Sequence, residues 1–432
     1  MQFRNLLTAV TVFLLLTACN QPEKKEVKPD FLAANIDTTI NPAEDFFLYA
    51  NGGWIKKTPI PESESGWGIG NLVNEEIYDR KKKINENAVK ENAAEGTTSQ
   101  KIADFWISGM DTVDIEKQQL KPLQADMDKI EAIKSVNDLI LLTAAFHNKG
   151  VDVLFGEYAG QDQKNSDVIA YQLGQAGLGM PNRDYYFNTD ERTAGVRKAY
   201  QVYLNKTFQQ MGSDSASAAK TSAAVFALET KLAKASRKLA DLRDPYKNYN
   251  KMSVAELGKL TSNINWSVYL PAVGVKKIDS VIVGQPEFLT ALNHELTATS
   301  ISDWKNYFRF QLVQSSAAYL DKQTFTNLFE YRKSLTGAKE PRPRWKRVLD
   351  AEEGAIGEAL GQLFVKEYFN ETAKKRYSDL VEAIRDAYKE RIKNLSWMSD
   401  STKAKAYDKL AKITKKVGYP DKWKDFSALK ID

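Results

Sequence analysis

The segment NPAEDFFLYANGGWIKKTPIPESESGWGIGN, residues 41–71, contains more conformationally restrictive residues than any other part of the chain. Asn41, Pro42 and Glu44 predict a helix start, because a capping side chain, a first-turn proline and an acidic third residue suit the free N–H groups there. The N-G-G step at 51–53 predicts that this helix ends in left-handed dihedrals. By composition the segment is an aromatic anchor that holds an N-terminal stretch against a helical body.

The run from Asp45 to Pro61, D-F-x-x-Y-A-N-G-G-W-x-x-x-x-x-I-P, resembles the opening signature of the neprilysin and endothelin-converting-enzyme family of zinc metallopeptidases. Further blocks resemble family segments in the family's order, among them a D-F-Y-x-S-x-M-D-T segment, an L-G-L-P-x-R-D-Y-Y loop and an R-W…L-G-x-L-Y/F-V helix. These blocks lie at 104–116, 178–186, 243–252, 286–289 and 344–365. The resemblance covers nearly the whole exported chain and implies the helical, substrate-enclosing lobe of such a peptidase.

The composition is that of an ordinary globular protein, with 43% hydrophobic and 11% aromatic residues. A chain of 432 residues exceeds what one hydrophobic core usually serves, so two or more packed subdomains are expected. The net charge of +5 arises from 61 basic and 56 acidic residues spread along the chain, a balance that predicts no nucleic-acid partner.

Residues 1–18 are typical of a bacterial lipoprotein signal peptide. Arg4 supplies the charged start, and 9–16 form an apolar core that is too short to span a bilayer as a mature helix. The L-T-A-C sequence that ends at Cys19 resembles a lipobox, in which this cysteine becomes the first mature residue and carries the lipid. The alternative is a simple signal peptide with an incidental cysteine.

Residues 19–36 are polar and charged and are predicted to form a flexible tether, whereas 37–432 form the folded lobe. Because the only cysteine is committed to lipid, no disulfide is expected and packing must supply the stability. The prediction is an exported protein that is lipid-anchored to a bacterial membrane, on its periplasmic or cell-surface side.

Apolar residues at three- and four-residue spacing predict a mainly α fold from Asp79 onward. The period is illustrated by Leu380, Ile384, Ala387 or Tyr388, and Ile392, and each such helix is expected to hide its apolar face. The predicted helices are 75–94, 100–110, 121–148, 190–240, 286–297, 301–337, 352–369, 376–395 and 399–416.

Strand-like runs are rare. Alternating, β-branched runs at 151–158 and 167–173 predict a β-hairpin or a small sheet, with a third run at 280–283. The fold class is therefore a mainly α, multi-helix lobe with a small hairpin or sheet.

Most of the family-like blocks have structural rather than catalytic explanations. Gly357 and Gly361 lie one helical turn apart and predict a packing face where a neighbouring helix approaches closely. The Arg-Asp pairs at 183–184 and 243–244 predict ion pairs that tie loops to helices. These blocks identify a fold and no reaction centre.

Peptidases of this family hold one zinc ion with two histidines of a His-Glu-x-x-His helix and a later glutamate, and the motif's own glutamate is the general base. Residues four apart share one helix face, so both imidazoles reach one tetrahedral metal. This sequence has only two histidines, His147 and His294, and neither is predicted to bind metal. No catalytic residue, metal ligand or cofactor is therefore predicted within the chain, and zinc is expected only if a catalytic lobe follows Asp432.

Two residues of the opening stretch are candidates for substrate binding, Trp67 and Asn71. Gly66 stands where family members often carry an arginine that clamps a substrate carboxylate, and Asn71 stands for an acidic or amide residue. A carboxydipeptidase-like preference is therefore not expected.

The sequence lacks the motifs that several other enzyme chemistries need. There is no P-loop, no Gly-x-Ser-x-Gly elbow, no dinucleotide fingerprint and no histidine placed to activate a nucleophile. Acidic groups at 44–45, 75–76 and 350–353 could pair for glycoside hydrolysis, but the sequence sets no distance between them.

Three functions remain open. The first is the N-terminal lobe of a neprilysin-like zinc metalloendopeptidase, which binds peptides and is inactive by itself. The second is a truncated or split form of an active zinc metallopeptidase, whose partner is a C-terminal catalytic lobe. The third is a lipid-anchored lipoprotein that binds peptides or glycans without catalysis, which exposed-looking aromatics such as Trp67 and Trp423 favour.

Overall fold

In the computed structural model, residue 30 and residues 32–431 are described. The predicted signal peptide 1–18, Cys19 and most of the predicted tether therefore lie outside the described residues. The chain divides into two compact units, 1–61 and 62–432. None of the described helices combines the length and the apolarity that a bilayer crossing needs.

The first unit contains a 3-10 helix, η1 (Ala33–Asn35), and one α-helix, α2 (Phe46–Lys57). The predicted helix start at Asn41 is wrong. Asp45 is the N-cap, because its carboxylate accepts a hydrogen bond from a backbone N–H of the first turn at 2.8 Å.

The two glycines at 52 and 53 lie inside α2, so the predicted left-handed helix end is also wrong. Their small size serves packing instead. A Cβ atom on residue 52 would lie 2.7 Å from the Cβ of Asp37, and one on residue 53 would lie 2.9 Å from the carbonyl oxygen of Asn35. Lys56 Nζ lies 2.6 Å from the Asp37 carboxylate, and this contact, with hydrogen bonds from Thr39, lowers the pKa of Asp37 to about 2.

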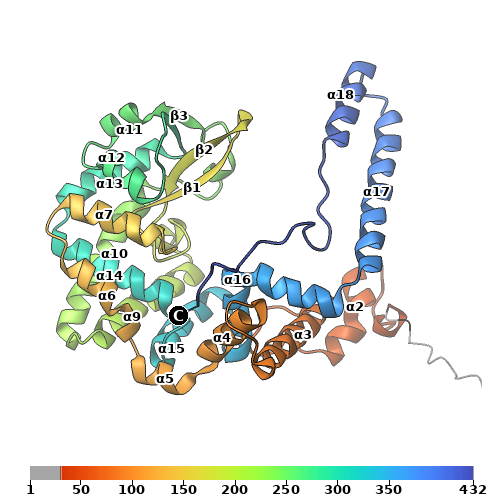
Figure 1. The fold of residues 1–432 in the computed structure, drawn as a ribbon, viewed down its shortest axis with the longest axis horizontal. Helices are drawn as coiled ribbons and strands as arrows, with labels where there is room; N and C mark the ends of the chain where they lie inside the picture. Colours follow the sequence, from red (N-terminus) through yellow and green to blue (C-terminus); the bar gives the residue numbers. More distant parts are fainter. Residues whose placement is uncertain (1–29, 31, 432) are drawn as a thin grey trace, which may run out of the picture. The chain divides into compact units, whose positions relative to one another are not determined.

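The second unit is mainly helical, as predicted (Figure 1). Its α-helices are α3 (Ile69–Glu91), α4 (Thr98–Met110), α5 (Thr112–Gln118), α6 (Gln124–Glu131), α7 (Val136–His147), α8 (Asp184–Phe187), α9 (Glu191–Gln210), α10 (Ser215–Ala235), α11 (Val254–Leu260), α12 (Trp266–Ala272), α13 (Pro286–Ala298), α14 (Ile301–Ser316), α15 (Lys322–Thr336), α16 (Arg344–Tyr368), α17 (Glu371–Lys393) and α18 (Asp400–Ala411). Short 3-10 helices lie at Lys121–Leu123 (η2) and Asp241–Arg243 (η3).

Three of the long predicted helices, 121–148, 190–240 and 301–337, are each divided into two in the structure. In every case the second helix starts at a side-chain N-cap. The caps are Ser135, Asp214 and Asp321, whose oxygens accept backbone N–H groups of the first turn. Apolar spacing continues on both sides of each cap, so periodicity alone did not reveal the breaks.

The predicted hairpin is confirmed and belongs to a four-stranded sheet in the order β1-β2-β4-β3. The strands are β1 (Phe155–Asp162), β2 (Asn165–Gln175), β3 (Asn250–Ser253) and β4 (Ser280–Val283). β1 and β2 are antiparallel, β2 and β4 parallel, and β3 and β4 antiparallel. β3 was not predicted, because its sequence N-K-M-S contains no β-branched or aromatic residue, unlike the equally short β4.

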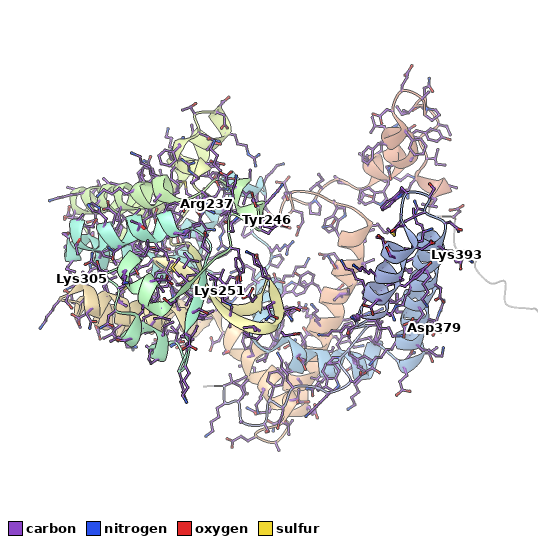
Figure 2. The ribbon with its side chains drawn as sticks, turned by 90° about the horizontal axis from the view of Figure 1, so that it is seen from above. Arg237, Tyr246, Lys251, Lys305, Asp379 and Lys393 are labelled. Carbon is purple, nitrogen blue, oxygen red and sulfur yellow. The ribbon has the colours of Figure 1, made fainter. Side chains whose placement is uncertain are left out.

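One ion pair joins two strands and another joins the segment after α10 to α13, and Figure 2 labels Lys251 and Arg237, one residue of each pair. Lys251 Nζ lies 2.9 Å from the buried carboxylate of Asp162, and Arg237 pairs with Glu287. The ion pairs predicted for Arg183–Asp184 and Arg243–Asp244 are wrong. Among the described residues, neither arginine forms an ion pair; Arg183 lies over the Phe187 ring, and Asp244 pairs with Lys247.

Most of the buried aromatic and aliphatic side chains form one core, which is built from α7, α9, α10 and α12–α15 around the sheet. A smaller apolar cluster joins α3, α4 and α16 and includes Ile84, Ile102 and Leu360. The helix α16 is kinked at Ile356, where φ is −134° and ψ is 31°. The smaller cluster packs α3 against α16, and these two helices form walls of the candidate site described below.

Candidate functional site

The two predicted substrate-binding residues lie at the start of α3. Asn71 Oδ1 accepts a hydrogen bond from Gly68 N at 3.0 Å, so this side chain closes the N-terminus of the helix. Trp67 is partly buried rather than fully exposed. A Cβ atom on Gly66 would meet no atom within 4 Å, so packing does not demand a glycine there. A substrate-binding role for Trp67 and Asn71 stays a prediction.

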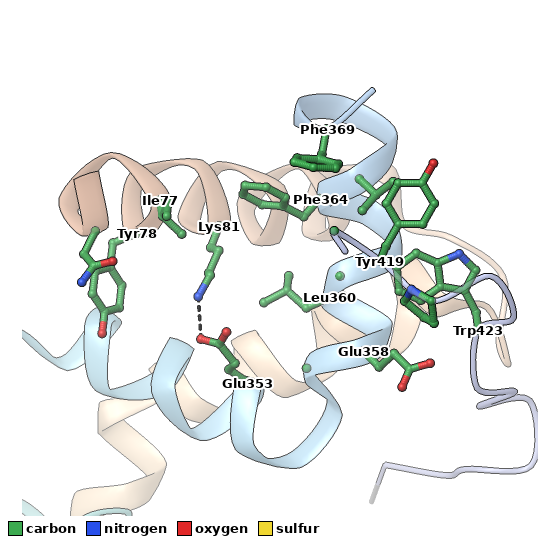
Figure 3. Close-up of a pocket in the computed structure, with 16 residues that line it drawn as sticks. Ile77, Tyr78, Lys81, Glu353, Glu358, Leu360, Phe364, Phe369, Tyr419 and Trp423 are labelled. Carbon is green, nitrogen blue, oxygen red and sulfur yellow. Dashed lines mark hydrogen bonds and ion pairs between the residues drawn. The ribbon is translucent and has the colours of Figure 1, made fainter. Parts of the chain in front are cut away.

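Farther along α3, the helix forms one wall of a cavity of about 580 Å³, which we call the α3–α16 cavity (Figure 3). Its other walls come from α16 and from the segment 418–423. The lining is mostly apolar and aromatic, with a few charged groups, which is the usual character of a ligand pocket.

The segment 418–423 forms the aromatic wall of the α3–α16 cavity. The rings of Tyr419 and Trp423 stack with centroids 5.8 Å apart and an interplanar angle of 8°. A Cβ atom on Gly361 would lie 3.6 Å from Trp423, so this glycine packs against the returning segment and not against another helix as predicted. Trp423 is accordingly partly buried, contrary to the exposure expected from the sequence.

Charged groups at the opposite end of the cavity are already paired. Lys81 forms an ion pair with Glu353, and the Tyr78 hydroxyl donates a hydrogen bond to Asp350. Burial and this hydrogen bond raise the pKa of Tyr78. Glu75 pairs with Lys346.

Most of the acidic groups that could have served glycoside hydrolysis therefore have separate structural partners. Those at 75–76 and 350–353 bind neighbouring lysine, arginine, tyrosine or asparagine side chains. Asp45 of the first unit caps α2.

A buried acid lies just behind this end of the cavity. Asn85 Nδ2 donates a hydrogen bond to Glu352 Oε2 at 3.0 Å. Both residues are fully buried, and burial raises the pKa of Glu352 to about 7. In the described structure, Asn85 Oδ1 and Glu352 Oε1 have no hydrogen-bond partner.

The two histidines lie far from this cavity. His147 ends α7, and its ring nitrogens contact the Tyr269 hydroxyl at 2.6 Å and the Val153 carbonyl oxygen at 2.9 Å. His294 is exposed on α13 beside Glu295. No group of three or more metal-ligating side chains occurs among the described residues, so they do not fit the donor set of a catalytic zinc.

The structure also shows a surface that the sequence pattern did not indicate. On α17, the apolar residues Leu380, Ile384 and Tyr388 were expected to be hidden, but they are 54%, 49% and 56% exposed. Periodicity identifies an apolar face, but it does not show whether another segment covers that face.

A solved structure with the same arrangement of helices and sheet is the zinc metalloprotease Zmp1 of Mycobacterium tuberculosis in complex with an inhibitor. It aligns with a TM-score of 0.86 and 31% identity, over 92% of this chain and 61% of that chain. The shared fold and the sequence identity together show that this chain is a domain of the zinc metallopeptidase class. Residues 42–420 match the sequence model of Peptidase family M13, and the chain belongs to this family, that of neprilysin and the endothelin-converting enzymes.

Endothelin-converting enzymes are among the relatives with curated sequences. The rat enzyme 1 is 29% identical over 403 residues, which are 90% of this chain and 52% of the rat protein. A homologue from Locusta migratoria is 30% identical over 407 residues, 89% of this chain and 55% of its own length. The chain thus spans about half the length of the curated relatives it matches.

Proposed function

We propose that this chain is the substrate-enclosing N-terminal lobe of an M13 zinc metalloendopeptidase, and that it acts in peptide proteolysis together with a zinc-binding catalytic lobe. The family membership and the likeness to endothelin-converting enzymes and to Zmp1 support this proposal. By itself the lobe binds peptides, holds no catalytic zinc and cleaves nothing.

The observation that carries the proposal is the exposed apolar face of α17. Tyr377, Leu380, Ile384 and Tyr388 follow a spacing of three and four residues, so they form one stripe along the helix. Asp379 and Lys393 mark the polar surface of the same helix (Figure 2). A stripe of large apolar side chains is unfavourable in water and marks an interaction site.

Within the described structure, Tyr377 at the N-terminal end of the stripe stacks on Phe369 with ring centroids 6.3 Å apart, whereas the rest of the stripe remains about half exposed. Polar residues outside the stripe also hold the helix: Glu382 pairs with Lys415, and Arg385 donates to the Ile413 carbonyl at 2.8 Å. We therefore assign the stripe to the catalytic lobe as its docking surface.

The test starts from the protein isolated from its native membrane, whose intact mass, zinc content and chelator-sensitive peptidase activity are measured. We expect a catalytic lobe, on the same or a second chain, and activity that is lost when Leu380 and Ile384 are both replaced by glutamate. Asp386→Asn, on the polar side of α17, is the control and should retain the activity. Chelator-sensitive activity from residues 19–432 alone would overturn the proposal.

A second candidate is a lipid-anchored lipoprotein that binds peptides or glycans without catalysis, and the α3–α16 cavity with its stacked Tyr419 and Trp423 favours it. A ligand that binds only the folded state raises the melting temperature by mass action. Such a rise with no turnover in the complete native protein would support this candidate over the peptidase lobe.

The proposed location is the periplasmic or outer face of a bacterial membrane, with a lipid on Cys19. Metabolic labelling with a fatty-acid analogue should mark the wild-type protein and leave Cys19→Ala unlabelled. Labelling of both proteins, or of neither, would contradict the anchor.

A further inference from the structure

A second cavity, of about 420 Å³, lies where α4 and α16 meet the turn that follows α14. We call it the arginine cavity. Two guanidinium groups, Arg344 and Arg347, line it together with apolar side chains such as Phe105 and Val348. No acidic residue is among its described lining residues.

Arg344 is fixed at one edge of the arginine cavity. Its Nε donates to the carbonyl oxygen of Gly109 at 2.8 Å. Helix α4 comes very near α16 here, because a Cβ atom on Gly109 would lie 2.6 Å from Val348 Cγ1. Within the described structure, Nε makes the one hydrogen bond of this guanidinium group, so both Nη groups remain available to a ligand.

Arg347 is fixed one helical turn further on. Its Nε and Nη1 donate to the carbonyl oxygens of Arg342 and Ala318, at 3.3 and 3.2 Å. Its Cζ lies 3.7 Å from the centroid of the Phe325 ring, which holds the guanidinium plane in place. Burial and the charge of Arg344 lower the pKa of Arg347 to about 10, so it is still cationic at neutral pH.

Neither cation has a counter-ion in the part of the chain that the structure describes, since no carboxylate lies within 4.0 Å of either one. Burial lowers the pKa of Arg344, and the charge of Glu116 acts against this shift from a distance. Glu116 Oε1 itself accepts a hydrogen bond from Lys322 N at 2.7 Å. The neighbouring Arg342 shows the contrast, because it grips Glu64 with Nε and Nη2 at 2.8 and 3.0 Å.

Two partly buried like charges without an anion are unfavourable, because each has lost hydration that no counter-ion replaces. A guanidinium group offers paired N–H donors that match the two oxygens of a carboxylate. The apolar wall beside the cations suits a hydrocarbon group, and the volume falls within the range of small-ligand pockets.

We propose that Arg344 and Arg347 form the anion-binding end of a second ligand site, which takes a carboxylate attached to an apolar group. The C-terminal carboxylate of a peptide with an apolar last residue has this chemistry, and so does a fatty acid. The site does not depend on a catalytic lobe, so its test is independent of the peptidase proposal.

The test measures the melting temperature and calorimetric binding of residues 19–432 with Cys19→Ser, at constant ionic strength. The probes are N-acetyl-alanyl-phenylalanine, the same dipeptide as its C-terminal amide, octanoate and inorganic phosphate. We expect the dipeptide acid to raise the melting temperature by about 2 °C at tenfold its Kd. The amide and phosphate should have no such effect, and octanoate separates a fatty-acid source from a peptide source.

Arg344→Gln and Arg347→Gln should each weaken binding of the carboxylate about tenfold or more, because hydrogen bonds to charged groups are lost. Arg342→Gln removes an arginine that already has a carboxylate partner, so it is the matched control and should keep the wild-type affinity. Arg344→Lys keeps the charge without the paired donors and should bind at intermediate strength. Three results would overturn the proposal. They are a dipeptide amide that raises the melting temperature as much as the acid does, unchanged binding in both glutamine variants, and no effect of either the dipeptide acid or octanoate.

Discussion

At the residue scale, Glu352 and Asn85 form the most informative buried polar pair. One hydrogen bond, from Asn85 Nδ2 to Glu352 Oε2, joins them, and both Asn85 Oδ1 and Glu352 Oε1 are buried without a donor in the described structure. A proton on Glu352 would supply the donor that these two oxygens lack. The raised pKa of about 7, which burial causes, agrees with a carboxyl group that holds its proton near neutral pH.

The first prediction concerns the pH dependence of the free energy of unfolding. The folded-state pKa of Glu352 is about 7 and its ordinary value is 4.5, so between these values the folded state holds a proton that the unfolded state has released. This contribution to stability is complete below about pH 4.5 and is lost as the pH rises to 7, by about 3 kcal/mol. Glu352→Gln should therefore be more stable than wild type at pH 8 and similar to it at pH 5.

Urea unfolding at the two pH values checks this prediction. Glu330→Gln, which alters an exposed ion pair with Lys333 on α15, is the control and should keep the wild-type difference. Equal pH dependence in Glu352→Gln and wild type would contradict the assignment. Glu229, whose pKa burial also raises to about 7, would then have to supply the dependence alone.

At the element scale, polar caps decide where long apolar patterns are divided into separate helices. Asp321 begins α15: its Oδ1 accepts hydrogen bonds from Gln323 N and Thr324 N at 3.0 and 3.1 Å. The residue is only 3% exposed, so water cannot replace it as the acceptor.

We expect Asp321→Ala to lower the free energy of unfolding by about 2 kcal/mol, the upper end of the range for a lost cap, because buried N–H groups are left unpaired. Denaturant titration measures this loss. Asp190→Ala removes the exposed cap of α9 and should cost less, about 0.5 to 1 kcal/mol. Equal losses in the two variants would show that burial of the cap is unimportant.

At the scale of the whole molecule, the α17 stripe determines how the isolated chain behaves. Without the proposed catalytic lobe, its apolar side chains face water and favour association between copies. We expect residues 19–432 to self-associate at micromolar concentration, and Leu380→Glu to shift the equilibrium toward monomer.

Sedimentation velocity over a range of concentrations checks this prediction. Lys375→Glu changes the charge on the exposed polar surface of α17 and should leave the association unchanged. A wild-type chain that is monomeric at every concentration would contradict it.

The sequence by itself determined what depends on local pattern and on family blocks. Apolar spacing predicted the helical fold, alternation predicted the β1–β2 hairpin, and the motifs from Asp45 to Val365 identified the family. These features could be predicted because side-chain period and turn chemistry act over a few residues.

Only the tertiary structure decided which residues approach one another from distant parts of the chain. Gly52 allows Asp37 to pack against a helix, Trp423 returns to cover Gly361, and Arg344 and Arg347 meet in one cavity without a counter-ion. The physical reason is that close approach, burial and charge pairing are properties of contacts between segments. The sequence pattern shows whether a face of a helix or strand is apolar or polar, and only the fold determines which segment covers that face.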